Sequence, residues 1–265
     1  MIRLNLPSWK NLKCFNIIEE EGTMELKTQE EKPSYLLPFD KNIYRYERKF
    51  LIPGITVHDV ELIVKLHPAI FSEIYSQRYV NNIYFDSINL TNYFDNVNGV
   101  TNRVKYRIRW YGELGGLIEK PTLELKIKNG YLGRKLSYPL LPFELNSRLN
   151  FQKILKILME SNIPRVIVEE LKNFSPMLIN RFSRKYFKSA DGRYRITIDS
   201  DFFLYRIGRQ YNSLLNRLTD DINVILELKY NRDFDEDADS ITNYFPFRMT
   251  KSSKYVSGVE KLFPY

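Results

Sequence analysis

Charged and apolar residues alternate one by one along several short segments of the chain. The clearest segment is residues 102–111, NRVKYRIRWY, where the alternation predicts a β-strand with two unlike faces. Between Arg103 and Trp110, one face is apolar or aromatic, and the other holds the cations Arg103, Lys105, Arg107 and Arg109. Because like charges on one face repel each other, four cations in a row favour contact with water or with an anion.

Three further segments repeat this pattern with charges of both signs on the ionic face. They are Thr122–Lys128, Arg193–Asp199 and Asn223–Tyr230. A sheet that closes with these ionic faces inward forms a polar tunnel, with helices packed outside. The predicted fold class is therefore α+β, an antiparallel β-barrel tunnel of about eight strands with an ionic interior.

The rest of the pattern supplies helices and connections. Helical spacing and alternation predict helices at 57–66, 151–161, 165–173 and 235–244, and strands at 43–52, 79–86 and 178–188. Asn96 and Gly99 belong to a turn-rich segment that is expected to be a loop, and 204–221 fits no single element. Residues 1–41 lack periodicity and are predicted to be an N-terminal extension or linker, which leaves 42–265 as the tunnel domain.

The net charge of +8 is concentrated in one part of the chain. Between Arg103 and Lys135 there are nine Lys or Arg and three Glu, a local balance of +6. This concentration favours a polyanion site over a uniformly basic surface.

Cys14 is the only cysteine, so an internal disulfide and a cysteine-based zinc site are excluded and a reducing, cytoplasmic location is expected. His58 and His67 stand apart from any metal-ligand pattern and are expected at the surface.

Eight motifs follow one another in the order found in a known family. They are YERKF (46–50), NGVTNRVKYRIRWYG (98–112), LELKIK (123–128), GRK (133–135), NRFSRKYF (180–187), RITID (195–199), ILELKY (225–230) and KSSKYVSGVE (251–260). The ordered set resembles the VTC-type polyphosphate polymerase domain of the triphosphate tunnel metalloenzyme, or CYTH-like, superfamily.

The resemblance implies a phosphotransferase that moves the terminal phosphate of a nucleoside triphosphate, expected to be ATP, to a growing polyphosphate chain. A hydrolase of the same fold that acts on triphosphate or polyphosphate is an alternative. A non-catalytic module that binds polyphosphate or inositol phosphates is another. Nucleic acid is not expected as a partner, because glutamates on the basic faces would repel its phosphates. By analogy with the family, a membrane-embedded partner at the cytoplasmic face of the membrane is expected.

The resemblance also implies which side chains carry the chemistry. The phosphate-handling cations would be Lys49, Arg107, Arg109, Lys126, Arg184, Lys251 and Lys254. Lys135 or Arg134 would extend the basic path, the Ser253 hydroxyl would donate to phosphate, and Arg103 and Lys105 complete the cationic strand face. Phosphoryl transfer suits such a set, because it needs positioning and charge neutralisation more than covalent chemistry.

Glu227 matches the position of the family's metal-binding glutamate. Glu47 and Glu124 are either additional ligands or members of internal salt bridges, and oxygen ligands beside phosphate suit Mn²⁺ or Mg²⁺.

Two positions depart from the related patterns. Arg45 stands where CYTH-type hydrolases begin their ExExK motif, which favours the VTC branch, and Phe182 stands where the family often has a tyrosine, so a hydroxyl contact to phosphate is lost.

Overall fold

The computed structural model describes residues 45–130, 132–210 and 212–264. The strands are β1 (Arg45–Pro53), β2 (Ser72–Ser87), β3 (Asn102–Tyr111), β4 (Gly116–Ile118), β5 (Thr122–Asn129), β6 (Leu132–Pro139), β7 (Phe143–Leu145), β8 (Phe174–Lys188), β9 (Arg195–Ile207), β10 (Asn212–Asp220) and β11 (Asn223–Asn231). The helices are α1 (Val57–Lys65), α2 (Thr91–Val97), α3 (Phe151–Glu160), α4 (Arg165–Leu171), α5 (Ala238–Thr242) and α6 (Lys254–Leu262). The predicted extension at 1–41 lies outside the described residues.

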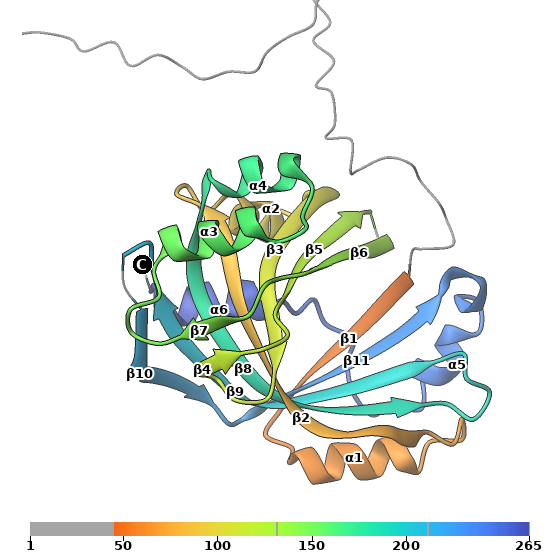
Figure 1. The fold of residues 1–265 in the computed structure, drawn as a ribbon. Coiled ribbons are helices and arrows are strands. Elements are labelled where there is room, and N and C mark those ends of the chain that lie inside the picture. The colour runs from red at the N-terminus through yellow and green to blue at the C-terminus, as the bar shows by residue number, and fades with distance from the viewer. Residues whose placement is uncertain (1–44, 131, 211, 265) are drawn as a thin grey trace, which may run out of the picture. The chain divides into compact units, whose positions relative to one another are not determined.

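The large sheet closes on itself. Its strand order is β10-β9-β11-β1-β6-β5-β3-β2-β8, and β8 also pairs with β9, so eight strands form a ring from which β10 extends (Figure 1). Neighbouring strands in the ring run antiparallel. The predicted α+β fold with an antiparallel barrel of about eight strands is therefore confirmed.

The apolar strand faces point away from the ring interior and pack under helices. One buried cluster contains Val60 and Val64 of α1, Ile241 of α5, and Phe50, Ile198 and Leu226 of the strands. On the side of β3 and β5, where α3 and α4 lie together (Figure 1), Tyr106 and Trp110 are buried. Because side chains alternate along each strand, the ionic positions between these apolar ones face the interior of the ring.

Most predicted elements are confirmed to within a few residues, but the loop predicted around Asn96 is wrong because this residue lies in α2. Asp86, at the end of β2, is fully buried and accepts hydrogen bonds from the amides of Asn92 and Tyr93 at 2.9 and 3.0 Å. A carboxylate from the preceding strand thus satisfies the free N–H groups at the start of the helix. The turn residues of the sequence do not reveal this cap, because Asp86 lies at the end of the preceding strand.

His67 is buried, so its predicted surface position is also wrong, whereas His58 is exposed as expected. The Ala69 amide donates to His67 Nδ1 at 3.0 Å, which leaves Nε2–H to donate to the Ile241 carbonyl at 2.9 Å. The ring also packs beside Phe245, with centroids 4.9 Å apart. His67 therefore links the segment that follows α1 to α5 and has a structural role.

Helix α6 packs against inward-facing residues of β2, β8 and β9. Tyr84 pairs with Arg107 on one side and Leu178 on the other, and paired residues of antiparallel strands share a face. Tyr84 and Leu178 therefore face inward with Arg107, and Tyr255 and Val259 of α6 pack against them. The Tyr255 hydroxyl adds a hydrogen bond of 2.5 Å to Asp86. This packing fixes the start of α6 among the ionic side chains.

Gly258 of α6 is packed so closely that a larger side chain does not fit there without displacing its neighbours. A Cβ atom at Gly258 would lie 2.8 Å from a methyl group of Leu178 and 3.3 Å from one of Leu204. We expect Gly258→Val to lower the free energy of unfolding by about 1–3 kcal/mol, the usual cost of overpacking. Ser257→Val at the exposed neighbouring position is the matched control. Urea denaturation of both variants checks the prediction, which would be contradicted by equal stabilities.

Candidate functional site

Strands β1 and β11 present alternating charges to the ring interior. In their register, Glu47 lies opposite Lys229 and Lys49 lies opposite Glu227. Glu227 Oε1 lies 3.5 Å from Lys49 Nζ, and its Oε2 lies 2.9 Å from Lys229 Nζ. Glu47 Oε2 lies 2.8 Å from Lys126 Nζ on β5. The two glutamates are therefore diagonal neighbours, each held by cations from more than one strand.

A buried pair from β8 and β9 continues this network. Arg184 binds Asp199 through two nitrogens, Nε at 2.5 Å and Nη2 at 2.6 Å. Lys254, the first residue of α6, places its Nζ 2.6 Å from Asp199 and 3.3 Å from Glu227. Helix α6 thus contributes a cation to the same group of charges as β1 and β11.

A second group of charges forms around Glu124 on β5. Arg107 Nη2 lies 2.7 Å from Glu124 Oε2, and Lys135 Nζ lies 2.6 Å from Oε1. Arg109 is 3.6 Å from the same carboxylate, and its Nε donates to Asn82 Oδ1 at 2.8 Å. Glu124 therefore holds three of the predicted phosphate-binding cations in place, which corresponds to the salt-bridge alternative.

The surrounding cations keep the carboxylates ionised. Burial would raise the pKa of Glu227, but Lys229 and Lys254 outweigh burial and hold it well below its ordinary value. Burial likewise opposes ionisation of Glu47, yet Lys126 and Lys49 hold its pKa well below the usual range. Burial lowers the pKa of Lys126 to about 8, despite the opposing attraction of Glu47. At neutral pH the interior therefore holds ionised carboxylates among an excess of cations.

Lys105 and Arg103 lie on the cationic face of β3 but outside these two groups. Lys105 Nζ donates to Asn96 Oδ1 at 2.9 Å and to Ser253 Oγ at 3.1 Å. Arg103 Nη1 donates to the Val100 carbonyl at 2.5 Å. Both side chains therefore donate to oxygen atoms that carry no charge.

The segment before α6 runs beside β1. The Thr250 amide donates to the Lys49 carbonyl at 2.8 Å, and Lys49 Nζ donates to the Ser252 carbonyl at 3.1 Å. Ser253 accepts an amide hydrogen bond at the start of α6, so its hydroxyl already caps the helix. Lys251 is exposed in this segment. The KSSK motif thus brings Lys254 to the ionic interior, whereas Lys251 is exposed.

Arg134 does not face the ring interior, contrary to the expectation from the sequence. It pairs with Ile127, whereas its neighbour Lys135 pairs with Lys126. Because paired residues share a face, Arg134 lies on the outer, apolar side of β6, and the expectation that it lines the tunnel is wrong. A motif of three consecutive residues does not reveal which of them faces inward until the register is known.

Three residues of the interior were not among the predicted site residues. Asp199 and Lys229 had a usable signal, because both fall on ionic strand faces in the sequence pattern. Asn82 had none, since its contact with Arg109 depends on the pairing of β2 with β3.

Phe182, at the position where the family often has a tyrosine, contacts its neighbours through its aromatic ring. Its ring lies 5.7 Å from that of Phe202, and Lys254 Nζ lies 4.9 Å from the Phe182 centroid. An aromatic face attracts a cation through its quadrupole. Phe182 therefore helps to position Lys254 beside Asp199.

Glu47 and Glu227 fit a divalent cation of the hard type. Among the described residues, no group of three or more His, Cys, Asp or Glu side chains is arranged to hold a metal ion. Mg²⁺, however, is commonly bound by one or two carboxylates together with phosphate oxygens of the substrate. The neighbouring ionised glutamates, surrounded by cations that attract phosphate, match that donor set.

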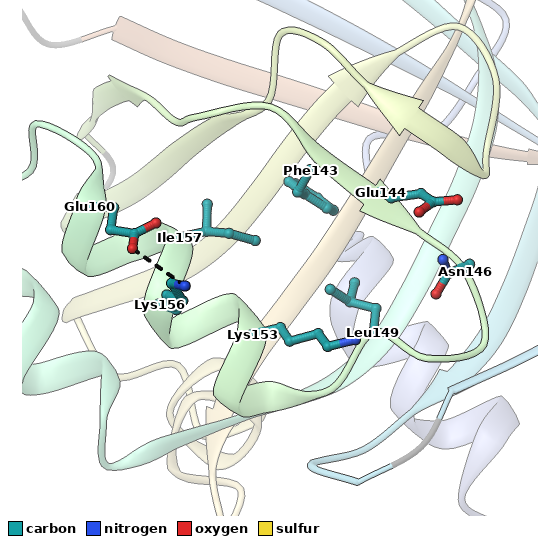
Figure 2. Close-up of a pocket in the computed structure, with 8 residues that line it drawn as sticks. All are labelled: Phe143, Glu144, Asn146, Leu149, Lys153, Lys156, Ile157 and Glu160. Carbon is teal, nitrogen blue, oxygen red and sulfur yellow. Dashed lines mark ion pairs between the residues drawn. The ribbon is translucent and has the colours of Figure 1, made fainter.

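A hollow of about 220 Å³ beside α3 and β7 offers different chemistry (Figure 2). Lys153, Lys156 and Glu160 face it, and Lys156 already pairs with Glu160 at 3.7 Å. Its lining includes apolar residues such as Leu149 and Ile157 but none of the predicted site residues. The ring interior is therefore the stronger candidate site.

An eight-stranded antiparallel ring with this ionic interior is the fold of triphosphate tunnel proteins, which implies chemistry on phosphate or polyphosphate. The chain belongs to the VTC domain family, whose sequence model matches residues 44–263. No curated protein matches the chain. Within the described residues, none of the helices has the length and apolarity needed to cross a membrane.

Solved structures are similar at low identity. A Hippeastrum protein assigned as an adenylyl cyclase, with a dominant triphosphatase activity, has 14% identity and a TM-score of 0.49, covering 82% of this chain and 95% of that chain. A Vibrio parahaemolyticus protein assigned as an adenylate cyclase has 10% identity and a TM-score of 0.45, with coverage of 79% and 95%. A Pyrococcus horikoshii protein has 11% identity and a TM-score of 0.42, with coverage of 82% and 96%.

Proposed function

We propose that the protein is a polyphosphate polymerase that transfers the terminal phosphate of a nucleoside triphosphate, ATP in the first instance, to a growing polyphosphate chain. The observation that supports this most strongly is the convergence of cations around two neighbouring ionised glutamates. Lys49, Lys126, Lys229 and Lys254 reach Glu47 or Glu227 from four elements. Such an interior can neutralise an extended polyanion and still provide oxygen ligands for a metal.

In the proposed reaction, an oxygen of the chain's terminal phosphate attacks the terminal phosphorus of the nucleotide, and the nucleoside diphosphate leaves. Lys126 and Lys49 would neutralise the oxygens of the transferred group. Arg107 and Arg109 would grip neighbouring phosphates, because their planar guanidinium groups bind phosphate oxygens in pairs. Asn82 and Glu124 hold these two arginines in position before substrate binds. The protein contributes positioning and charge, as phosphoryl transfer requires.

A divalent cation, Mn²⁺ or Mg²⁺, held by Glu227 and Glu47 would add charge neutralisation at the phosphate oxygens. Asp199 is engaged with Arg184 and Lys254 and keeps these cations oriented. The membrane-embedded partner belongs to the proposal through the family resemblance alone, and the cytoplasmic location belongs to it also through the single cysteine.

Product analysis tests the assignment. Purified protein is incubated with ATP and Mn²⁺, and the products are separated on a gel that resolves polyphosphate. We expect a ladder of polymer from the unaltered protein, and a loss of at least about 100-fold in Lys126→Met, comparable to removing a charge-stabilising group from an active site. Lys156→Met, at an exposed lysine outside the ring interior, is the control.

The alternatives give different products. Free phosphate without polymer would favour a hydrolase. Binding of polyphosphate without consumption of ATP, unchanged by Glu227→Ala or by removal of metal, would favour a binding module. Full polymerase activity in Lys126→Met would contradict the proposed role of this lysine.

A further inference from the structure

Lys105 differs in its contacts from the interior lysines that form ion pairs with Glu47, Glu124 or Glu227. No carboxylate of the described residues lies within ion-pair distance of its Nζ, which contacts Asn96 Oδ1 and Ser253 Oγ. Because an amide and a hydroxyl carry no charge, they orient the nitrogen without neutralising it. The ring interior therefore changes here from ion pairs to basic side chains that donate to neutral oxygen atoms.

Among the described residues, the charged groups that act most strongly on Lys105 are cations. Arg103 and Arg107 come from β3, Lys126 from β5 and Lys49 from β1. Helix α2 and the segment before α6 contribute the neutral Asn96 and Ser253, and Asp95 of α2 acts on Arg103. These like charges repel one another, and a bound anion would reduce that repulsion.

Arg103 provides a second, independent observation that favours an anion at this place. Its Nε is buried and, within the described part of the chain, has no hydrogen-bond acceptor. Its Nη1 is engaged by the Val100 carbonyl, which fixes the guanidinium in place. A buried nitrogen without an acceptor is costly, and an oxygen ligand would satisfy it.

We propose that Lys105, oriented by Asn96 and Ser253 and flanked by Arg103, forms an anion subsite for a phosphate group of the bound chain, and that this lysine takes up a proton when the phosphate binds. The inference rests on the proposed function and adds to it a second kind of phosphate contact. Cations paired with glutamate stay charged in the empty protein, whereas Lys105 gains its charge with the ligand. The proton comes from solvent and completes the ammonium group, so no other bond changes.

The pKa of Lys105 supports this coupling. Burial, followed by the repulsion of Lys126 and Lys49, lowers the pKa of Lys105 to about 6. At pH 7.5 the free protein therefore holds this side chain mostly neutral. A bound phosphate favours the charged form and raises the pKa, so binding takes up close to one proton between the two pKa values. Above pH 7, this lysine's contribution makes binding about tenfold weaker for each pH unit.

Proton uptake can be measured directly. Inorganic tripolyphosphate is titrated into the protein at pH 7.5 and constant Mg²⁺ by isothermal calorimetry, in buffers of different ionisation enthalpy. Tripolyphosphate itself exchanges protons, so the informative quantity is the difference between variants. Lys105→Arg keeps a cation that does not titrate in this range and is expected to bind while taking up about one proton less. Lys156→Arg, at an exposed lysine, should behave like the unaltered protein.

A second variant leaves the lysine in place. Asn96→Asp puts a carboxylate where the amide oxygen now lies, 2.9 Å from Lys105 Nζ. The lysine should then be charged before ligand binds, so proton uptake should fall by about one even though the same side chain is present. Thermal unfolding of each variant shows that the compared proteins are folded.

The outcomes separate the two proposals. A fall in proton uptake in both Lys105→Arg and Asn96→Asp supports the subsite. Uptake equal to that of the unaltered protein in these folded variants overturns it and leaves the proposed polymerase intact. Failure of the unaltered protein to bind tripolyphosphate overturns both.

Discussion

Replacing Glu227 with glutamine should reduce polymer synthesis by at least about 100-fold while leaving the protein folded. Its carboxylate is almost fully buried, and Lys49, Lys229 and Lys254 all lie within 3.5 Å of it. Glutamine keeps the shape but removes the charge that orders these cations. It also provides a weaker oxygen for a divalent cation, because hard cations favour carboxylates.

The measurement is the rate of polymer formation over a range of Mn²⁺ concentrations. If the carboxylate binds metal, Glu227→Gln should need more Mn²⁺ than the unaltered protein and should stay slow at saturation. Glu144→Gln, at an exposed glutamate on β7, is the control for removal of one negative charge. An unchanged rate and an unchanged Mn²⁺ requirement in Glu227→Gln would exclude Glu227 from the site.

Local alternation was enough to predict the walls of the barrel. NRVKYRIRWY became β3 without a shift of either end, and its aromatic side chains Tyr106 and Trp110 are buried as expected. This works because the period of two in a strand is set by the backbone and needs no knowledge of the partner. The direction of each ionic face followed in turn from the burial of the opposite face.

Pairing, in contrast, depends on register, which the sequence does not display. Arg134 and Lys135 are equivalent as residues of a basic motif, and only the pairing of β5 with β6 places one outside and the other beside Glu124. Helix α2 was missed because its cap comes from Asp86 in another element. The dual role of Ser253, which caps α6 and accepts from Lys105, likewise required the three-dimensional arrangement.

The burial of Asp199 leads to the largest expected effect on stability. Asp199 is fully buried and receives two hydrogen bonds from Arg184, which is itself mostly buried. Removing one partner of such a pair leaves an uncompensated charge and typically costs about 3–5 kcal/mol. We expect Arg184→Met to lower the free energy of unfolding by this amount, although Lys254 remains 2.6 Å from the carboxylate.

Urea denaturation at neutral pH measures this loss, and Arg195→Met, at an exposed arginine on the same strand as Asp199, is the control. Adding Asp199→Asn to Arg184→Met should recover part of the stability, because the unpaired charge is then removed. A loss below about 1 kcal/mol, the upper end for exposed ion pairs, would contradict the burial argument.

The same pair predicts how the loss changes with pH. Burial would raise the pKa of Asp199, but Arg184 and Lys254 hold it below its ordinary value of 3.8. A depressed carboxylate pKa contributes stability that is present above the unfolded-state value and is lost as pH falls through the folded-state value. The stability difference between the unaltered protein and Arg184→Met should therefore be full at pH 7 and shrink below pH 4. A difference that stays constant into acid would mean that packing of the arginine side chain, and not its charge, supports this part of the barrel.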